Sequence, residues 1–511
     1  MYPPLAVDFK DESRMANEHF DVLIVGAGLS GIGAGWHLQA SAPGRSYVIL
    51  EGRDAIGGTW DLFRYPGIRS DSDMYTLGYA FKPWREAKAI ADGPSILKYV
   101  RDTARDHGID KHIRYGHQVK SAAWSSEDAA WTVEALRSDG KTVRITANFL
   151  FLCGGYYSYE AGYTPKFPGA ERFKGQVVHP QKWPERLDYA GKRVVVIGSG
   201  ATAVTLVPEM AKTAGHVTML QRSPTYVVSR PAEDALANRL RKWLPAMLAY
   251  GLIRWRNVLF GMWFFRLART KPEVVKKNII DMVRAQLGPD YDVGTHFTPS
   301  YNPWDQRLCL VPDADLFEAI KAARASVVTD HIETFTETGI RLKSGAELPA
   351  DIIVTATGLN LQVMNGLAIT VDGRAVDPGQ TLSYKGMMYE DVPNLASAFG
   401  YTNASWTLKC DLTCDYVCRL LNHMARTGLR QVTPRNHDPD IERQPWLDFT
   451  SGYVKRAMEK FPKQGSKAPW KLHQNYALDL MSLKYAKLED GTLEFSNPRP
   501  AEVKAREKVA A

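Results

Sequence analysis

Two glycine-rich turns, each directly after a short apolar run, constrain the fold of this chain more than any other feature. The first turn, GAGLSG at 26–31, follows the apolar residues 22–25, and the second, GSGATA at 198–203, follows residues 194–197. Small residues at these spacings permit a tight strand-to-helix turn, close approach of the backbone to a pyrophosphate, and close packing of helix on strand. The helix that follows points its N-terminus at the phosphates. The sequence therefore predicts two dinucleotide sites.

Two polar residues distinguish the predicted sites. Glu51 ends the second strand of the first unit, where a carboxylate binds both ribose hydroxyls of FAD or NAD and repels a 2′-phosphate. In the second unit the corresponding strand ends at Gln221 and Arg222, and a guanidinium pairs with a 2′-phosphate. A surface arginine is the alternative interpretation of Arg222. FAD in one site and NADPH in the other predict hydride transfer to the flavin.

The composition excludes several classes of protein. A chain of 511 residues is too long for one core, and its net charge of +8 is spread along the sequence, so we expect no nucleic-acid partner. The five cysteines form no CxxC pair, which argues against a flavin-linked disulfide reductase and a zinc ribbon. Cys410, Cys414 and Cys418 recur every four residues and predict a packing face of a helix, with a metal cluster as the alternative. We expect no metal cofactor.

The two ends of the chain and its longest apolar runs bear on where the protein lies in the cell. The N-terminus lacks a basic segment followed by an apolar stretch, so no secretory signal is expected. No uncharged run reaches the length of a membrane span. Together with reduced cysteines, this predicts a cytoplasmic protein.

The order of the apolar runs predicts an α/β chain with two Rossmann-like dinucleotide-binding domains, one for FAD and one for NADPH, and a helical insertion in the NADPH domain. A buried strand at 149–152 ends in glycines, and further strands of the second domain are predicted at 325–328 and 352–355. The predicted segments are an N-terminal extension (1–18), the FAD-binding domain (19–158 and 358–497), the NADPH-binding domain (159–230 and 299–357), the insertion (231–298) and a polar tail (498–511).

For two helical segments the sequence also predicts what each helix contacts or faces. Residues 232–287 are rich in Trp and Phe with arginines between them. We expect this segment to pack on the second nucleotide domain, and peripheral contact with a membrane is the alternative. A helix at 405–426 is expected to end near Gly428 and to point its positive N-terminus toward the flavin pyrimidine.

A third motif lies between the two glycine turns. Residues 173–184 have the pattern F-x-G-x-x-x-H-x-x-x-W-P, with His179 and Trp183 at its marked positions. A histidine between two nucleotide domains would orient a linker or relay a proton. The pattern resembles the fingerprint of the Baeyer–Villiger family of class B flavin monooxygenases, and the resemblance covers nearly the whole chain. The segments GGTWDLFRYPGIRSD at 57–71 and YNPWDQR at 301–307 are most similar to the ethionamide-activating (thioamide-prodrug) branch.

The resemblance implies an FAD- and NADPH-dependent enzyme that converts ketones to esters or lactones through a C4a-peroxyflavin, and that also S-oxygenates thioethers and thioamides. It implies catalytic roles for Arg307, Asp71 and His179, in which the permanent cation of Arg307 stabilises the anionic oxidant and Asp71 holds the guanidinium. The alternatives are a dedicated S- or N-monooxygenase and, outside enzymes, a flavin-binding sensor. Substrates would be a small ketone or thio-compound and O2. The natural substrate and the oligomeric state stay open.

The family's cofactor contacts transfer to this chain position by position. Gln306 stands where many relatives carry a second basic residue, so the strictness of the preference for NADPH over NADH also stays open. The implied contacts to FAD come from Gly26, Gly28, Ser30, Gly31, Glu51, Gly58, Thr59, Trp60, Asp61, Asp71 and Val119, those on the nicotinamide side from Arg69, Ser70 and Asp71, and those to NADPH from Gly198, Ser199, Gly200, Ala201, Thr202, Ala203, Val204, Gln221 and Arg222.

Overall fold

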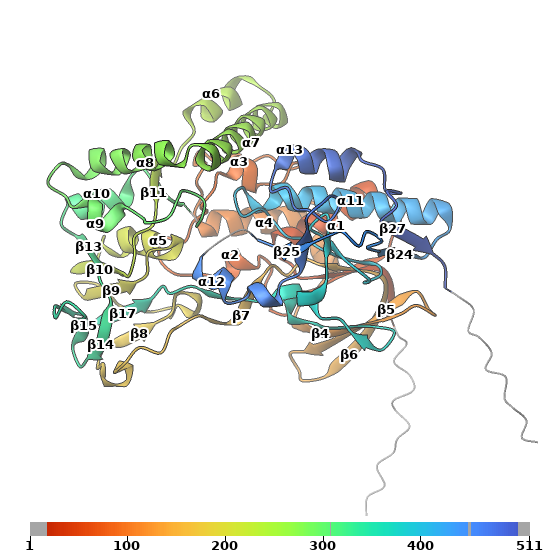
Figure 1. Cartoon of the computed structure of the whole chain (residues 1–511), viewed down its shortest axis with the longest axis horizontal. Coiled ribbons are helices and arrows are strands. Elements are labelled where there is room, and N and C mark those ends of the chain that lie inside the picture. Colours follow the sequence, from red (N-terminus) through yellow and green to blue (C-terminus); the bar gives the residue numbers. More distant parts are fainter. Residues whose placement is uncertain (1–17, 307, 448–450, 499–511) are drawn as a thin grey trace, which may run out of the picture.

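The computed structural model describes residues 18–306, 308–447 and 451–498, and its two main sheets lie side by side along the long axis (Figure 1). The predicted extension at 1–18 and the tail at 498–511 therefore lie almost wholly outside the described residues, and Glu18 already belongs to a strand. The first sheet has the order β20-β19-β4-β5-β6-β1-β2-β3, with β23 paired to β6. Its strands are β1 Glu18–Val25, β2 Tyr47–Leu50, β3 Ile113–Arg114, β4 His117–Ser125, β5 Ala130–Arg137, β6 Thr142–Leu152, β19 Ala368–Val371, β20 Arg374–Ala375 and β23 Leu395–Ser397.

The second sheet is parallel throughout and has the order β13-β10-β9-β17-β8. The strands predicted at 149–152, 325–328 and 352–355 are confirmed, since they fall in β6, β13 and β17. The bounds are β8 Gln176–Val178, β9 Arg193–Ile197, β10 His216–Gln221, β13 Ala325–Thr329 and β17 Ile352–Thr355.

Each sheet has a switch point at the strand that precedes a glycine turn. β1 lies between β2 and β6 and is parallel to both, and β9 lies in the same way between β10 and β17. The chain leaves β1 through α1 (Leu29–Ser41) and β9 through α5 (Ala201–Met210). Open parallel sheets bind ligands in the crevice at the carboxyl ends of such strands. The predicted doubly Rossmann-like fold is therefore observed.

The first glycine of each turn is required by close packing. A Cβ on Gly26 would lie 2.7 Å from the Cα of Gly154, which follows β6, and a Cβ on Gly198 would lie 2.3 Å from the carbonyl oxygen of Ala356, which follows β17. Both glycines also have a positive φ, of 99° and 138°. Each turn can therefore form only where the backbone carries no side chain.

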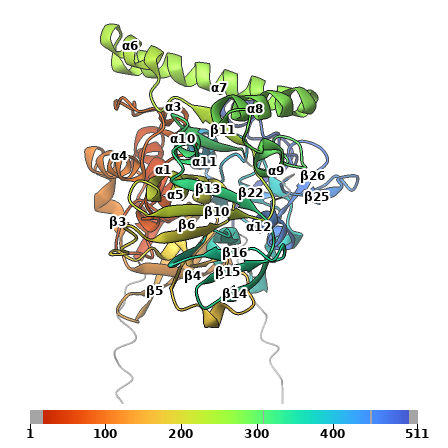
Figure 2. The ribbon, with the colours of Figure 1, turned by 90° about the vertical axis from the view of Figure 1, so that its left-hand side faces the viewer.

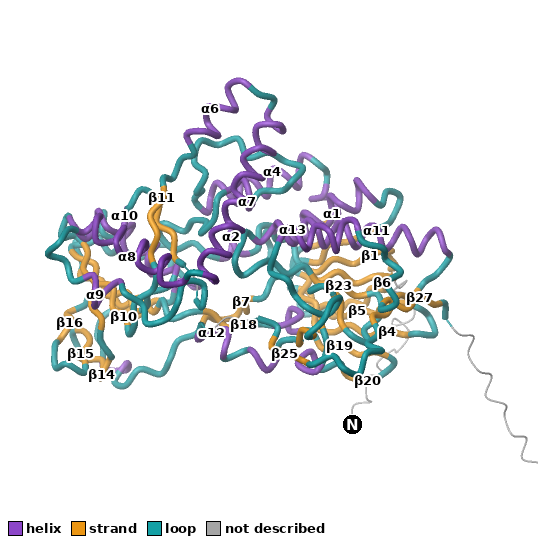
Figure 3. Tube along the Cα trace, turned by 45° about the horizontal axis from the view of Figure 1, so that its top comes forward, coloured by secondary structure: helices purple, strands orange, loops and turns teal. Residues whose placement is uncertain are grey.

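Two short strands cross between the sheets and carry the chain from one to the other. They are β7 (Tyr157–Gly162) and β18 (Leu359–Leu361), which pair antiparallel between the two sheets (Figure 3). Near this crossing the chain passes from the first sheet to the second and later returns. The two nucleotide-type folds are therefore joined by paired linkers.

The predicted helical segment is confirmed as α6 (Ala235–Trp243), α7 (Ala246–Thr270) and α8 (Pro272–Leu287), and Figure 2 shows α6 and α7 along one edge of the molecule. Its packing partly differs from the prediction. α8 contacts α10 (Asp315–Lys321) beside the second sheet, but α7 packs on α3 (Met74–Leu77) of the first unit. The reason is Arg254, whose buried guanidinium donates to the carbonyl oxygens of Tyr75 and Gly78.

The long helix near the C-terminus is also confirmed. α11 (Trp406–Thr427) ends at Gly428, whose φ of 69° gives a left-handed cap. Cys410, Cys414 and Cys418 of α11 are buried in the core together with Cys153, as a packing face requires. No helix in the described part of the chain combines the length and apolarity needed to traverse a bilayer.

The remaining elements support these units. The helices are α2 Thr59–Leu62, α4 Gly93–Asp106, α9 Val293–Phe297, α12 Gly452–Lys455 and α13 Tyr476–Asp479, followed by one π-helical turn, η7 Leu480–Tyr485. The strands are β11 Val227–Arg230, β12 Cys309–Pro312, β14 Ile332–Thr336, β15 Gly339–Leu342, β16 Glu347–Pro349, β21 Ser383–Tyr384, β22 Met388–Tyr389, β24 Gln431–Pro434, β25 Arg443–Pro445, β26 Lys463–Gly465 and β27 Leu493–Ser496.

Gly31 offers a test of the packing between α1 and β1. A Cβ at this position would lie 1.9 Å from the carbonyl oxygen of Gly26, so Gly31→Ala must displace the helix or the turn. We expect the free energy of unfolding to fall by about 3 kcal/mol. Gly261→Ala is the matched control, because its Cβ meets nothing within 4 Å in the middle of α7, and it should stabilise the protein by about 0.5–1 kcal/mol. Urea unfolding of both variants measures the difference, and equal stability would contradict the packing argument.

Candidate functional site: one cavity between two glycine turns

The N-termini of α1 and α5 face the same cavity, which has a volume of about 540 Å³. Gly28, Leu29 and Ser30 line it from the first turn, and Ala201 and Thr202 line it from the second. The two turns are more than 160 residues apart in sequence, so this meeting is a property of the fold. Ligands bound at the two turns would therefore lie in one shared space.

Both helices begin in a way that suits a phosphate. Gly28 and Gly200 are the N-cap residues of α1 and α5, and no side chain of the described residues caps either helix. A Cβ on Gly200 would meet no atom within 4 Å, and one on Gly28 would meet only Gly58. Uncapped first-turn amides and the positive end of the helix dipole attract an anion. The two turns thus fit the pyrophosphates of two dinucleotides.

Glu51 lies at the edge of the cavity beside the first turn. Its two carboxylate oxygens accept the backbone N–H groups of Ala27 and Arg53, at 2.8 and 3.0 Å. Burial raises the pKa of the Glu51 carboxyl, while these two hydrogen bonds oppose the shift. The side chain is thus fixed against the turn with oxygen lone pairs still available, as ribose recognition requires.

Most residues predicted to touch FAD gather around this cavity. Ser30 accepts a hydrogen bond of 2.8 Å from the indole N–H of Trp406, at the start of α11. This contact links the N-termini of α1 and α11, so the predicted orientation of α11 toward the flavin side is consistent with its position. The predicted residues that line the cavity are Gly26, Gly28, Ser30, Glu51, Gly58, Thr59, Trp60, Arg69, Ser70, Asp71, Val119, Ala201 and Thr202.

Three other predicted residues lie behind the cavity wall. Gly31 packs on Gly26, and Ala203 and Val204 are buried in the core of α5. Their role in the structure is close helix–strand packing. They position the turns without reaching a ligand with a side chain.

Asp61 likewise does not line the cavity. Its buried carboxylate is paired with Arg53 at 2.6 Å and Arg101 at 3.2 Å, and Arg64 lies 3.5 Å away. This cluster ties α2 to α4 behind the loop that carries Gly58 and Trp60. Asp61 is placed to hold that loop.

The second turn presents its polar groups at the surface of the second sheet. The hydroxyl of Ser199 donates to the carbonyl oxygen of Ser223 at 3.0 Å, so the turn lies against the end of β10. Arg222 is exposed beside this contact. Gln221 is buried, and its amide donates to His296 and Thr329, so its side chain points away from the turn. Arg222 is therefore a cation at this edge that is exposed to a ligand.

His179 lies at the linker crossing and lines neither of the two cavities described here. Its Nδ1 accepts the backbone N–H of Gln181 at 3.1 Å, and its ring packs on Gly162 so closely that a Cβ there would lie 1.9 Å away. Burial lowers its pKa. Of the two sequence interpretations, this position favours orientation of the linker.

Arg69 makes an ion pair between the two units that the sequence did not predict. Its guanidinium contacts the carboxylate of Asp315, the first residue of α10. Burial raises the pKa of Asp315, against the attraction of Arg69. Arg69 lines the cavity, so the pair joins its wall to the second unit. The guanidinium that the resemblance assigns to the nicotinamide side is therefore already paired.

A second, larger cavity of about 1130 Å³ adjoins the first, between the helical insertion and the loop before α11. Asp71, Leu310 and Ser405 line both cavities, so the two spaces meet there. Its walls are largely apolar, with Phe260 and Trp304 among them. Concave apolar spaces with few polar groups are typical of small-molecule sites. Arg307, the predicted catalytic arginine, lies outside the described residues.

Sequence reasoning missed part of the first cavity's wall. Tyr156, Tyr157 and Tyr159 line it from the start of the β7 linker, and Asn365 lines it after β18. These residues follow no motif and come from segments that pack together only in the folded chain. Three tyrosines within four positions, directly after the glycines at 154–155, were the available signal.

Two family models match the N-terminal half of the chain. A flavin-binding monooxygenase-like model matches residues 88–258, and a model of an NAD(P)-binding Rossmann-like domain matches residues 24–89. The FAD-containing monooxygenase EthA of Mycobacterium tuberculosis (strain ATCC 25618 / H37Rv) is 55% identical over 487 residues, which is 95% of this chain and 99% of EthA. EthA of Mycolicibacterium smegmatis is 54% identical over 485 residues, 95% of this chain and 98% of that protein.

Solved structures of lower identity share the fold. An oxidized steroid monooxygenase bound to NADP has a TM-score of 0.74 at 23% identity, covering 94% of this chain and 100% of that chain. An open structure of cyclohexanone monooxygenase has a TM-score of 0.71 at 23% identity with the same coverage. The monooxygenase OTEMO, in complex with FAD and NADP, has a TM-score of 0.67 at 22% identity, covering 82% of this chain and 88% of that chain.

Glu51 provides the test of the first site. Glu51→Gln removes the charge that strengthens hydrogen bonds from ribose hydroxyls, and we expect the affinity for FAD to fall at least about tenfold, or about 1.4 kcal/mol. Glu160→Gln is the control, because Glu160 is an exposed carboxylate in the wall of the same cavity. Titration of apoprotein by flavin fluorescence gives both dissociation constants. Equal weakening in the two variants would mean that Glu51 has no specific contact with the ribose.

Proposed function

This chain belongs to the EthA-type FAD-containing monooxygenases, and we propose that it inserts one oxygen atom of O2 beside a ketone carbonyl to give an ester or lactone. The observation that carries the proposal is the single cavity shared by the N-termini of α1 and α5. Bound FAD, reduced by NADPH, supplies the oxygen-transfer chemistry: one oxygen atom enters the substrate, the other leaves as water, and NADPH provides two electrons.

The chain's own residues bind and orient the two cofactors. The uncapped N-terminus of α1 would hold the FAD pyrophosphate, and Glu51 would accept hydrogen bonds from the adenosine ribose. The N-terminus of α5 would hold the pyrophosphate of NADPH, and the exposed Arg222 would pair with its 2′-phosphate. Both nucleotides would then extend toward the cavity that the two turns share.

The larger cavity is the proposed substrate site. Its largely apolar wall area suits the carbon skeleton of a ketone or thio-compound. At its junction with the first cavity, Asp71 supplies a carboxylate. We assign Arg307 as the cation that stabilises negative charge on the oxidant, with Asp71 as the group that holds the guanidinium. This pairing rests on the family motif.

The products of turnover test the activity. With NADPH and O2, the purified enzyme should convert a simple ketone to its ester, and gas chromatography with mass spectrometry detects it. Arg307→Ala should lower ester formation at least about a hundredfold, as expected for loss of one electrostatic stabiliser. FAD should remain bound in this variant. Sulfoxide from a thioether without any ester from ketones would replace the proposal by a dedicated S-oxygenase.

The choice of nicotinamide cofactor is tested separately. Arg222→Ala should raise the KM for NADPH about tenfold or more, because a charge-assisted contact to the 2′-phosphate is lost. The KM for NADH should be unchanged in steady-state oxidation assays. Arg172→Ala, which removes another exposed arginine in the same half of the chain, is the control. An equal rise in the KM for NADH would mean that Arg222 is a surface arginine without a specific contact to the 2′-phosphate.

A further inference from the structure

Helix α7 is apolar on two opposite faces. One face is buried in the protein and includes Tyr250, Ile253 and Val258. The opposite side carries large exposed apolar side chains, which we call the α7 apolar face: Leu248, Leu252, Trp255, Leu259 and Trp263. Their spacing of three and four residues puts them on one side of the helix. An apolar helix exposed on one side marks a contact surface.

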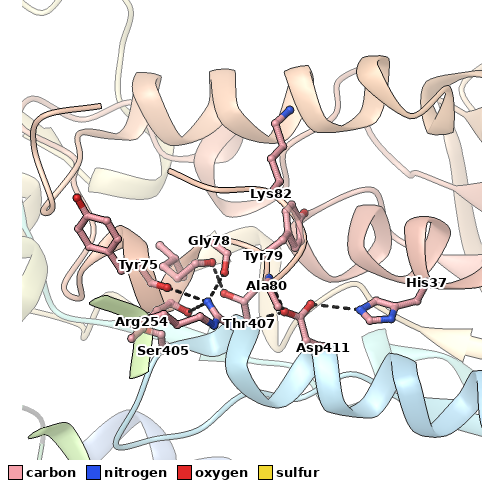
Figure 4. Close-up of polar contacts among 12 residues, drawn as sticks. His37, Tyr75, Gly78, Tyr79, Ala80, Lys82, Arg254, Ser405, Thr407 and Asp411 are labelled. Atoms are coloured by element: carbon pink, nitrogen blue, oxygen red, sulfur yellow. Dashed lines mark hydrogen bonds and ion pairs between the residues drawn. The ribbon is translucent and has the colours of Figure 1, made fainter. Parts of the chain in front are cut away.

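The exposure of this face does not come from loose packing of the helix. On the inner side of α7, Arg254 donates to the carbonyl oxygens of Tyr75 and Gly78, and it lies 3.5 Å from the carboxylate of Asp411 (Figure 4). Asp411 also accepts the backbone N–H of Ala80 at 3.0 Å. A buried guanidinium with these partners fixes the rotation of α7 about its axis. The α7 apolar face is thus held outward.

Neighbouring elements extend the same surface. Trp243, at the end of α6, is 83% exposed. On the other side, the ring of Trp255 lies 5.7 Å from that of Tyr476, the first residue of α13. Beyond α13, the side chains of Met481 and Tyr485 in η7 are 61% and 63% exposed. Figure 1 shows α6, α7 and α13 along one side of the molecule.

Basic side chains predominate in this segment. Residues 235–272 contain eight Lys and Arg side chains and no Asp or Glu, and three of them, Arg254, Arg256 and Arg269, are paired with the carboxylates of Asp411, Asp234 and Asp305. Arg239, Lys242 and Arg266 are exposed, and Lys484 of η7 is exposed as well. Trp and Leu on one side of a helix, flanked by cations, are the pattern of helices that lie in the plane of an anionic membrane surface.

The larger cavity reaches this surface. Leu259 and Trp263 belong to the α7 apolar face and also line the cavity, and so do the exposed Leu236 and Phe260. The cavity that meets the first one at Asp71 therefore extends to the α7 apolar face.

We propose that α6, α7 and η7 bind the surface of a membrane that contains anionic lipids, with the α7 apolar face inserted among the lipids, so that lipophilic substrates pass from the bilayer into the larger cavity. The binding step is inferred only from the exposed apolar and basic residues of this surface. The passage of substrate rests on the proposed function.

Vesicle flotation of the intact protein tests the binding, without NADPH or substrate. The protein should float with vesicles of phosphatidylglycerol and phosphatidylcholine, and brominated lipids should quench its tryptophan fluorescence. Leu252→Asp should lower the bound fraction about tenfold, because it removes apolar contact and adds repulsion. Leu252 is 51% exposed and lines neither cavity. Val177→Asp, at a 48% exposed residue of β8, is the control and should bind like the wild type.

Each contrary result has a definite meaning. Equal flotation of the wild type and Leu252→Asp, or equal binding to pure phosphatidylcholine, would overturn the proposal. So would a wild type that ignores vesicles but forms dimers that Leu252→Asp abolishes in light scattering, since a second copy would then cover this face.

Turnover separates this proposal from the proposed function. Leu252→Asp should oxidise a water-soluble ketone at the wild-type rate without vesicles. It should turn over a long-chain ketone embedded in anionic vesicles several-fold more slowly than Val177→Asp. Equal rates with the embedded ketone would overturn the delivery step. If the wild type oxidises neither ketone, the proposed function is wrong, and the flotation result still supports membrane binding.

Discussion

The organisation of this protein depends on two helix N-termini that no side chain of residues 18–306, 308–447 and 451–498 caps. In both α1 and α5 the N-cap is a glycine, so the first-turn amides and the positive end of each dipole face outward from the turn. The fold directs both ends into one cavity. A capping Ser or Asp would satisfy these amides locally and remove the attraction for a phosphate. The architecture therefore keeps two anion sites available beside one cavity.

Buried charges position the units around that cavity. Asp61 and its three arginines hold the loop at one wall, and Arg69 pairs with Asp315 where the two folds meet. Arg254 joins the helical insertion to the first unit by satisfying backbone carbonyls. Removing one partner of such a buried group leaves the other without compensation. These contacts explain how a long, partly exposed helix acquires a defined position beside the larger cavity.

The elements near the turns were predictable because their signals are local. Residues 22–25 and 194–197 are continuous apolar runs, and the glycines that follow them are required by backbone contacts within the same unit. Glu51 and Arg222 were identified from their place at the ends of strands. The prediction was less complete for α7, since an apolar helix gives no indication of which neighbour it will cover. The three tyrosines at 156–159 were missed for a similar reason, because linkers have no periodic pattern.

The sequence by itself determined that two strand–turn–helix units exist and which side chains stand at their ends, since backbone sterics and local spacing decide both. Only the tertiary structure decided that the two units open into one cavity, that Asp61 lies behind the wall, that His179 packs at the linker crossing, and that α7 turns an apolar face to the solvent. These outcomes depend on contacts that local spacing does not specify, from Asp61 with Arg101, 40 positions apart, to Arg254 with Tyr75, 179 positions apart. Their energies come from packing and buried charge pairs, which no local pattern encodes.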